Sequence, residues 1–465
     1  FEAIGKKRED FTESELSAYG DYCINDVDLT YKAFLHMAKD FPKNELKLID
    51  LTLRMFVEPV LDLDLGLLEQ HLAETRYEKE SLLQQCAVMG VSKDDLMSNP
   101  KFAEALRRLG VEPPMKISPT TGQETLALAK SDEDFKSLAE HENPQVKILV
   151  NARLGNKSTL EETRTQRFID ISKRGLLPVP VRYYAAHTGR WGGDDKINLQ
   201  NLPSRGKNGK KLKRSIIAPK GYTIIDADSS QIEARVLAWL AGQDDLTEAF
   251  ANGEDVYVNM ASKIYNKPEE EITKDERFVG KTTILGAGYG MGALKFQSQL
   301  QTFGFDMQIE EARRVIGVYR DTNWKINKLW RDAQDVLRAL YNKEHPTLLG
   351  CGEVLETVPK ENGIRLPSGL MMRYGDLACE QSDGRVEYNY RTRNGRTRIY
   401  GGKVIENVCQ AIARCIIGEQ MLKINKRHRV VLTVHDSIAA CVKDEEVKEA
   451  QTYVEECMKW TPDWA

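Results

Sequence analysis

Four side chains spaced four residues apart have the types needed to bind a nucleotide. They are Arg277, Lys281, Leu285 and Tyr289, in the segment RFVGKTTILGAGYG. Because a helix turns every 3.6 residues, this spacing places them along one slightly drifting stripe, here called the ladder. Two cations, an apolar side chain and a phenol suit a ligand with a polyanionic tail and a flat base, such as a nucleoside triphosphate. The ladder alone leaves open an amphipathic helix with solvated basic residues.

Two other nucleotide-binding motifs overlap the ladder, and both fail. Gly280-Lys281-Thr282 resembles the end of a P-loop, but Asp275 stands where that motif needs its first glycine. The segment 288–293 fits a loose dinucleotide fingerprint, but we expect a charged helix before it rather than the required strand. We therefore expect these glycines to end or bend the helix and to allow close backbone approach.

Two carboxylates could form a metal site. Asp228 follows a short buried strand expected at 223–227, and Asp436 lies in an expected three-residue turn of a hairpin at 430–442. If the two strands are neighbours, both carboxylates lie at one sheet edge and can hold a pair of Mg²⁺ ions. Such a site activates one oxygen and stabilises another, as in polymerases and nucleases. The alternative for each residue is a turn or helix-cap role.

The elements that would position these residues are mostly helical. We expect helices at 11–40, 44–58, 67–89, 230–250 and 406–425, short helical segments over 92–145, mostly helix over 253–345, and short strands and turns over 350–400.

Composition places few limits on function. The 465 residues allow two to four domains, and 41% hydrophobic and 29% charged residues are ordinary for a globular protein. No apolar run is long enough to span a membrane, and no signal peptide is evident. The chain starts at Phe1, so we expect a fragment or a processed product. Eight cysteines without CxxC pairs argue against a zinc site and indicate reduced, cytoplasmic thiols.

Positive charge is concentrated in one part of the chain. Residues 151–220 hold 16 Lys/Arg and 5 Asp/Glu, an excess of +11 in a chain whose net charge is −4. The densest run is 205–214, RGKNGKKLKR. Such a run predicts a track for a phosphate backbone, and the alternative is a solvated basic loop.

Together these segments resemble family A DNA polymerases, and phage members in particular. The similarity covers about residues 20–465, in the family's order. Its motifs are the first palm motif at 228–235 (DSSQIEAR), the ladder with Gly290, the second palm motif at 434–437 (VHDS), the primer–template segments at 188–191 (TGRW) and 198–203 (NLQNLP), and the palm-helix segments at 400–403 (YGGK) and 406–410 (ENVCQ). The resemblance implies an α+β fold, the right-hand polymerase architecture of palm, fingers and thumb.

The resemblance also implies a role for each matching residue. Asp228 and Asp436 would bind two Mg²⁺ ions, with the Ser229 carbonyl as an extra ligand. Arg277 and Lys281 would neutralise the triphosphate, and Lys281 would donate a proton to the leaving pyrophosphate.

Further residues would contact the base, the sugar and the duplex. Tyr289 would pack near the templating base, and Glu233 would exclude a 2′-hydroxyl, so the enzyme should prefer deoxynucleotides. Gln231 and Leu285 complete the expected nucleotide site, and His435 would contact the primer terminus. Minor-groove acceptors near the primer end, which report correct pairing, would be read by Arg190, Gln200, Asn201 and Gln410.

The two ends of the chain extend the resemblance. Tyr22 and Asp26 resemble the last motif of a 3′–5′ proofreading exonuclease, whose other carboxylates would lie before Phe1. We therefore expect only the C-terminal remnant of that domain and no proofreading. The segment 460–465 stands where the family usually continues into another strand, so we expect truncation at this end too.

Two positions depart from the family pattern. Leu285 stands where most cellular members have Phe or Tyr, a variant known among phage polymerases. Ser437 stands where a Glu usually follows the catalytic Asp, so one auxiliary carboxylate is lost.

The sequence thus predicts a template-directed DNA polymerase acting in phage DNA replication, in the cytoplasm of a bacterial host, with primer–template DNA and dNTPs as its partners and no membrane. Whether a processivity factor or a helicase–primase also binds is left open. The expected parts are an exonuclease remnant at 1–40, palm at 41–66, 151–239 and 346–465, thumb at 67–150 and fingers at 240–345. The alternatives are an inactive DNA-binding fragment of such a polymerase, a single-subunit RNA polymerase, which Glu233 argues against, and a metal nuclease.

Overall fold

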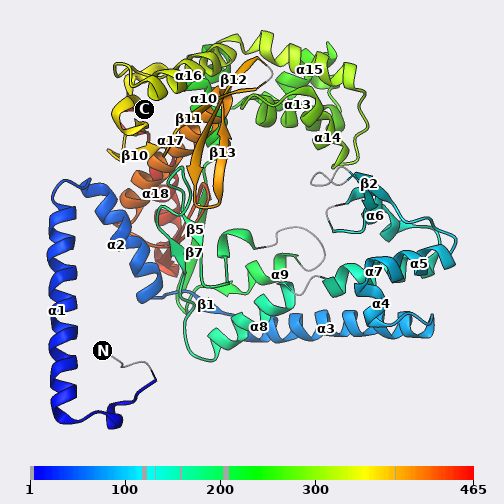
Figure 1. The fold of residues 1–465 in the computed structure, drawn as a ribbon, viewed down its shortest axis with the longest axis horizontal. Coiled ribbons are helices and arrows are strands. Elements are labelled where there is room, and N and C mark those ends of the chain that lie inside the picture. Colours follow the sequence, from blue (N-terminus) through cyan, green and yellow to red (C-terminus); the bar gives the residue numbers. More distant parts are fainter. Residues whose placement is uncertain (1–4, 118–122, 131, 158–159, 203–208, 383) are drawn as a thin grey trace.

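The computed structural model describes residues 5–117, 123–130, 132–157, 160–202, 209–382 and 384–465 (Figure 1). Its centre is a three-stranded antiparallel sheet in the order β14-β15-β7, formed by β7 (Tyr222–Asp228), β14 (Arg429–Val434) and β15 (Ser437–Lys443). β15 is the middle strand and is buried along most of its length. β7 is an edge strand of partly exposed residues rather than the buried strand we predicted.

The turn of the predicted hairpin is shorter than expected. Val434 pairs with Ser437, so only His435 and Asp436 lie in the turn, and the prediction of three turn residues was wrong. His435 adopts a positive φ of 54°, a conformation that tight two-residue turns demand and that non-glycine residues adopt only at a cost.

One helix forms the core of the body. α17 (Gly401–Ile424) is buried on nearly every side and begins five residues before the predicted start. Helices and strands pack around it, which explains its all-round burial. Its helical neighbours are α2 (Lys43–Val57), α10 (Ile232–Ala241), α16 (Trp324–Asn342) and α18 (Val447–Lys459).

The single helix predicted at 230–250 is two helices. α10 ends at Ala241, and α11 (Asp244–Ala251) follows after a break. Gly242 has a φ of +63° and caps α10 in the left-handed conformation, which glycine adopts without steric cost.

Four helices form a limb with a hydrophobic core of its own. They are α12 (Val256–Tyr265), α13 (Lys274–Ala287), α14 (Ala293–Gln301) and α15 (Ile309–Thr322). Gly280 lets α13 lie close to α12, because a Cβ there would meet the Tyr257 carbonyl oxygen at 2.2 Å. This packing role agrees with our rejection of a P-loop.

A second limb is built on α3 (Leu65–Val88), which extends away from the body (Figure 1). Its separate core centres on Phe102 and Phe135, whose rings meet edge-on at 5.8 Å. The other elements of this limb are α4 (Lys93–Met97), α5 (Asn99–Arg108), β2 (Met115–Ile117), β3 (Glu124–Leu126), α6 (Glu133–Ser137), α7 (Pro144–Lys157) and α8 (Leu160–Ser172).

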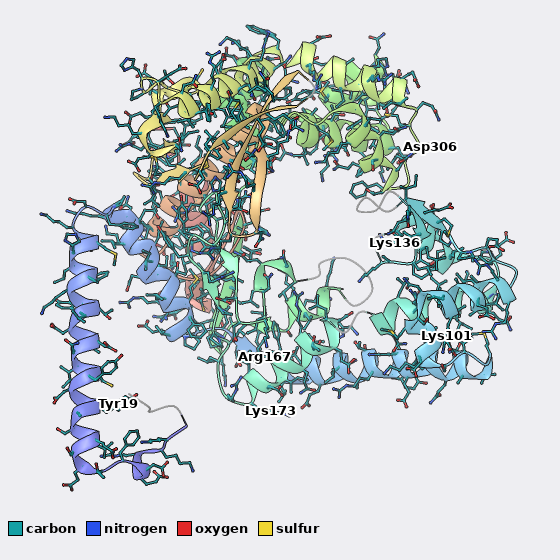
Figure 2. All side chains as sticks on the ribbon, viewed as in Figure 1. Tyr19, Lys101, Lys136, Arg167, Lys173 and Asp306 are labelled. Carbon is teal, nitrogen blue, oxygen red and sulfur yellow. The ribbon has the colours of Figure 1, made fainter. Side chains whose placement is uncertain are left out.

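The tips of the two limbs approach each other. Figure 2 labels Lys136 on the α3 limb and Asp306 on the other limb, at the ends where the two limbs come nearest in this view. A cavity of about 580 Å³ is lined by both tips, with Lys116 and Asp132 on one side and Gln301 and Phe305 on the other.

Two small sheets confirm the strands expected between 350 and 400. One consists of β8 (Glu356–Val358), β9 (Gly363–Arg365) and β10 (Met371–Arg373), and the other of β11 (Ala378–Ser382), β12 (Arg385–Thr392) and β13 (Gly395–Ile399).

α1 (Glu13–Ala38) stands apart from the body and has no buried residue (Figure 1). Several large apolar side chains on it are exposed, among them Ile24, Val27 and Met37. Among the described residues, no helix combines the length and apolar composition that crossing a bilayer requires. The subdomain boundaries predicted from the sequence stay predictions. α16 lies at the end of the range predicted for the fingers, but it packs on α17 and contributes to the main core.

Candidate active site

The fold brings the two predicted carboxylates together. Asp228 ends β7 and pairs in register with Ser437, the residue after Asp436. The backbone N–H of Ser229 donates to the Asp436 carbonyl oxygen at 2.9 Å. Both carboxylates line one cavity of about 480 Å³ at this sheet edge, as the sequence led us to expect.

The donors at this edge suit a hard divalent cation. Carboxylate and carbonyl oxygens are the ligands that Mg²⁺ takes, and it commonly uses one or two protein carboxylates and fills its remaining positions with water or substrate phosphates. Within the described ranges no group of three His, Cys, Asp or Glu side chains could hold a metal ion. The two carboxylates and the Ser229 carbonyl are thus the oxygen donors predicted from the sequence for this edge.

A cation from the predicted primer–template segment reaches the same carboxylates. One Nη of Arg190 donates to Glu233 Oε1 and lies 3.2 Å from Asp436 Oδ1. Tyr289 Oη donates to the other oxygen of Glu233 at 3.4 Å. Burial raises the pKa of Asp436, and the nearby charges of Glu233 and Asp228 raise it further, while Arg190 works in the opposite direction. Glu233, the residue predicted to exclude a 2′-hydroxyl, thus shares one network with the predicted metal ligands.

The ladder lies mainly on α13, with its last residue beyond the helix. Arg277, Lys281 and Leu285 are on the helix and at least partly exposed, whereas the opposite face is buried. α13 ends at Ala287, so Tyr289 lies in the following turn and not on the helix as its spacing predicted. Burial raises the pKa of Tyr289, and neighbouring Cys409 and Glu233 raise it further, so its hydroxyl stays protonated.

The two ladder cations lie over one aromatic ring. Arg277 and Lys281 are 5.3 Å and 5.8 Å from the Tyr257 ring centroid, and Arg277 Nε donates to Asp255 Oδ2 at 2.7 Å. Asp255 also caps α12 by accepting from the N–H groups of Tyr257 and Val258. Partial burial acts to raise the pKa of Asp255, but hydrogen bonds from Arg277 and the helix terminus outweigh it, and the net pKa is lowered.

We did not predict a role for Asp255 or Tyr257. An Asp just before an apolar helix is a recognisable cap signal, but the cap pattern gives no hint of a partner 22 positions away.

The residues predicted to read the minor groove come from three separate segments. Thr188 Oγ1 donates to Gln410 Oε1 at 3.5 Å, which joins the segment containing Arg190 to α17. Gln200 and His435 line the cavity that holds Asp228 and Asp436. Asn201 ends the short 3₁₀ helix Leu199–Asn201, and its carbonyl accepts from Arg164. Gln231 adopts a positive φ of 54° as the residue before α10.

A third carboxylate that the sequence did not indicate lies beside the site. Ser437, which stands where the family resemblance implies a Glu, donates its hydroxyl to Asp226 Oδ1. Lys213 Nζ lies 3.6 Å from the other oxygen of Asp226. A period-two reading of β7 would have placed Asp226 on the face of Asp228.

The basic run is only partly described. Residues 203–208 lie outside the described residues, and α9 (Gly209–Arg214) contains the rest. Lys211 pairs with Glu74, and Lys213 pairs with Asp226.

Tyr22 and Asp26, the pair that resembles an exonuclease motif, both lie on α1. The charge and hydrogen bond of Asp26 raise the pKa of Tyr22.

Residues 66–464 match the model of the family described as DNA polymerase family A. The chain belongs to DNA polymerase family A. It is 26% identical to the DNA polymerase of Bacillus phage SP02 over 89% of this chain and 68% of the phage protein. It is also 29% identical to DNA polymerase I of Pseudomonas aeruginosa over 68% of this chain. This chain spans only 34% of that enzyme.

Comparison of solved structures confirms the polymerase fold. The POL domain of Pol1 from M. smegmatis, in a complex with DNA primer-template and dNTP, superposes with a TM-score of 0.64. The match covers 93% of this chain and 69% of that one at 22% identity. The predicted α+β polymerase fold and family are thereby confirmed, and a phage relative is among the similar proteins.

Proposed function

We propose that this chain catalyses template-directed DNA synthesis by adding deoxynucleotides to a primer 3′-hydroxyl. The observation that carries the proposal is the meeting of Asp228 and Asp436 at one sheet edge, in a network that extends through Arg190 and Glu233 to Tyr289. Two Mg²⁺ ions held by Asp228, Asp436 and the Ser229 carbonyl would supply Lewis-acid activation of the primer oxygen and charge stabilisation of the leaving group.

The ladder cations act on the triphosphate. Arg277 is held by Asp255 and the Tyr257 ring, so it is oriented before the nucleotide arrives. Lys281 pairs with no carboxylate in the part of the chain that the structure describes, which leaves its ammonium free to neutralise a phosphate and to protonate the departing pyrophosphate. Catalysis then depends mainly on positioning and electrostatics.

Glu233 selects the sugar. Its carboxylate is fixed from both sides by Arg190 and Tyr289, so it cannot easily move away from a 2′-hydroxyl. This supports a preference for dNTPs over ribonucleotides and favours a DNA polymerase over the single-subunit RNA polymerase. After addition, the new base pair would be checked through its minor-groove acceptors, which are common to all correct pairs. The residues that would read them are Arg190, Gln200, Asn201 and Gln410, and His435 would contact the primer terminus.

The architecture supports the proposed division into parts. The limb with α13 would be the fingers, the limb built on α3 the thumb, and the body with the β14-β15-β7 sheet the palm. Helix α1 with Tyr22 and Asp26 would be the exonuclease remnant. We place the enzyme in phage DNA replication in a bacterial cytoplasm, on the basis of the phage relative and eight free cysteines.

Primer extension tests this function. A labelled primer annealed to a template is incubated with the protein and Mg²⁺, with and without dNTPs. Elongation that requires dNTPs and follows the template supports the proposal. DNA binding without elongation identifies the inactive fragment, and primer loss without dNTPs identifies a metal nuclease; either result contradicts the proposal.

A further inference from the structure

A buried ion pair joins two helices behind the candidate active site. Arg414 on α17 and Glu45 on α2 are each only 2% exposed. Both Nη atoms of Arg414 donate to the two carboxylate oxygens of Glu45, in a bidentate arrangement. Tyr183 Oη donates to the same carboxylate, so the acid is satisfied by two partners.

The remaining N–H donor of this guanidinium, on Nε, binds a backbone turn. Arg414 Nε donates to the Gly189 carbonyl at 3.1 Å. Gly189 has a φ of +79°, and a Cβ there would meet the Tyr184 ring at 2.7 Å, so the turn has room only for glycine. The guanidinium also lies over three rings, at 4.8 Å from Trp191, 5.2 Å from Tyr183 and 5.7 Å from Tyr184. Arg414 therefore contacts the backbone of the turn at Gly189 and the aromatic rings that precede and follow it in the sequence.

Such a pair is a weak source of stability but a strong constraint. Removing two charges from water is costly, and their mutual attraction offsets this cost only when the geometry is good. Burial acts to lower the pKa of Arg414, but the hydrogen bonds and charge of Glu45 overcome it and raise the pKa above its usual range. Arg414 is thus a permanent cation whose N–H groups are committed to fixed partners.

The turn held in this way adjoins two residues predicted to meet the primer end. Arg190 follows Gly189 directly and contacts Glu233 and Asp436. Gln410 lies one helical turn before Arg414 on α17 and accepts from Thr188.

We propose that Arg414, oriented by Glu45, is a positioning residue that fixes Arg190 and Gln410 against the terminal base pair and so sets discrimination against mispaired primer ends. This inference rests on the proposed function, in which Arg190 and Gln410 read the minor groove. A correct pair gains from these two donors only if they lie at the right place, and a misplacement of about 1 Å can cost about 10²-fold in rate.

The test compares extension of matched and mismatched primer ends by the full chain under single-turnover conditions. The variants are Arg414→Lys, which loses the bidentate fork, and Glu45→Gln, which keeps the size of the side chain but loses its charge. Arg153→Lys is the matched control. Arg153 is also fully buried, contacts the Phe102 ring at 4.4 Å and donates to the Leu96 carbonyl, but it lies in the limb built on α3 and not in the body. Thermal unfolding is recorded for every protein.

We expect Arg414→Lys and Glu45→Gln to lower the ratio of matched to mismatched extension by about tenfold, mainly through slower matched extension. Arg153→Lys should lower the unfolding temperature and leave the ratio unchanged. In an Arg190→Ala background, Arg414→Lys should have much less effect on the ratio, since residues that act through one another are not additive.

Two results would overturn the inference. One is an unchanged ratio in a folded variant of either Arg414 or Glu45, and the other is an equal loss of discrimination in Arg153→Lys, which would mean that general destabilisation is the cause. A wild-type chain that fails to extend even the matched primer would instead contradict the proposed function. If Arg414→Lys does not fold, Glu45→Gln decides the question.

Discussion

Arg190 and Asp436 are in contact within the candidate active site. The Arg190 guanidinium lies 3.2 Å from Asp436 Oδ1, and both side chains are about three-quarters buried or more. In the proposed function that oxygen is a metal ligand, so Arg190 and a divalent cation compete for one negative charge.

Replacing Arg190 should therefore strengthen cation binding in the absence of DNA. We expect Arg190→Gln to bind Mn²⁺ about fivefold more tightly, which corresponds to about 1 kcal/mol for the competition that is lost. Titration followed by electron paramagnetic resonance measures the free ion directly. Arg167→Gln, which removes an exposed arginine paired with Asp195, is the control. Unchanged or weaker binding in Arg190→Gln contradicts the competition.

Glu233 is predicted to exclude ribonucleotides by its bulk. Glu233→Ala should raise the ratio of ribonucleotide to deoxyribonucleotide incorporation by about 5- to 150-fold, the range that relief of a steric conflict of about 1–3 kcal/mol gives. Glu233→Gln keeps the volume of the side chain and should retain most of the discrimination. Competition assays with both sugar types measure the ratio. No change in Glu233→Ala rules out the gating role.

Leu285 is predicted to tune nucleotide discrimination and speed without being needed for chemistry. It is 43% exposed on α13, so Leu285→Phe and Leu285→Tyr have room to form without disturbing the core. We expect a severalfold change in extension rate or in acceptance of dideoxynucleotides, with little change in unfolding temperature. Leu294→Phe, at a more exposed position on the neighbouring helix α14, serves as the control. If both Leu285 variants leave the kinetics untouched, the position is only a packing position.

His187 should make the fold less stable at mildly acidic pH. Its ring lies 5.3 Å from that of Tyr374 and 5.4 Å from that of Tyr390, and burial lowers its pKa below 6.5. Above pH 6.5 the imidazole is neutral in both the folded and unfolded states and contributes nothing to pH dependence. Below pH 6.5 the unfolded chain binds a proton that the folded chain resists, so the free energy of unfolding falls with pH.

The measurement is thermal unfolding at about pH 7.5 and about pH 5.5. His187→Phe keeps an aromatic ring between the two tyrosines and removes the titrating group. We expect a smaller loss of stability between the two pH values in His187→Phe than in the wild type. An equal loss in both proteins contradicts this account of His187.

The sequence predicted features that depend on local spacing. The ladder helix, the strand before Asp228 and the hairpin around Asp436 all follow from short-range patterns, and the order of the motifs identified the family. The break at Gly242 was missed because a single glycine within an apolar helical pattern does not reveal a left-handed cap.

Contacts between distant segments could not be predicted in this way. Glu45 and Arg414 are 369 positions apart, and each lies on an amphipathic pattern where a charged residue is expected to face solvent. Only the packing of α2 against α17 shows that both are buried. The same holds for Ser437 and Asp226, whose bond depends on the register between β15 and β7.

The most direct test of the central claim is single-turnover primer extension by the wild type, Asp228→Asn and Asp436→Asn. Each variant keeps the size of its side chain and removes one proposed metal-binding charge. We predict that the wild type extends the primer with Mg²⁺ and dNTPs, and that either variant extends it at least about 10³-fold more slowly while still binding primer–template. Extension at near wild-type rates by either variant would contradict the assignment of Asp228 and Asp436 as the catalytic carboxylates.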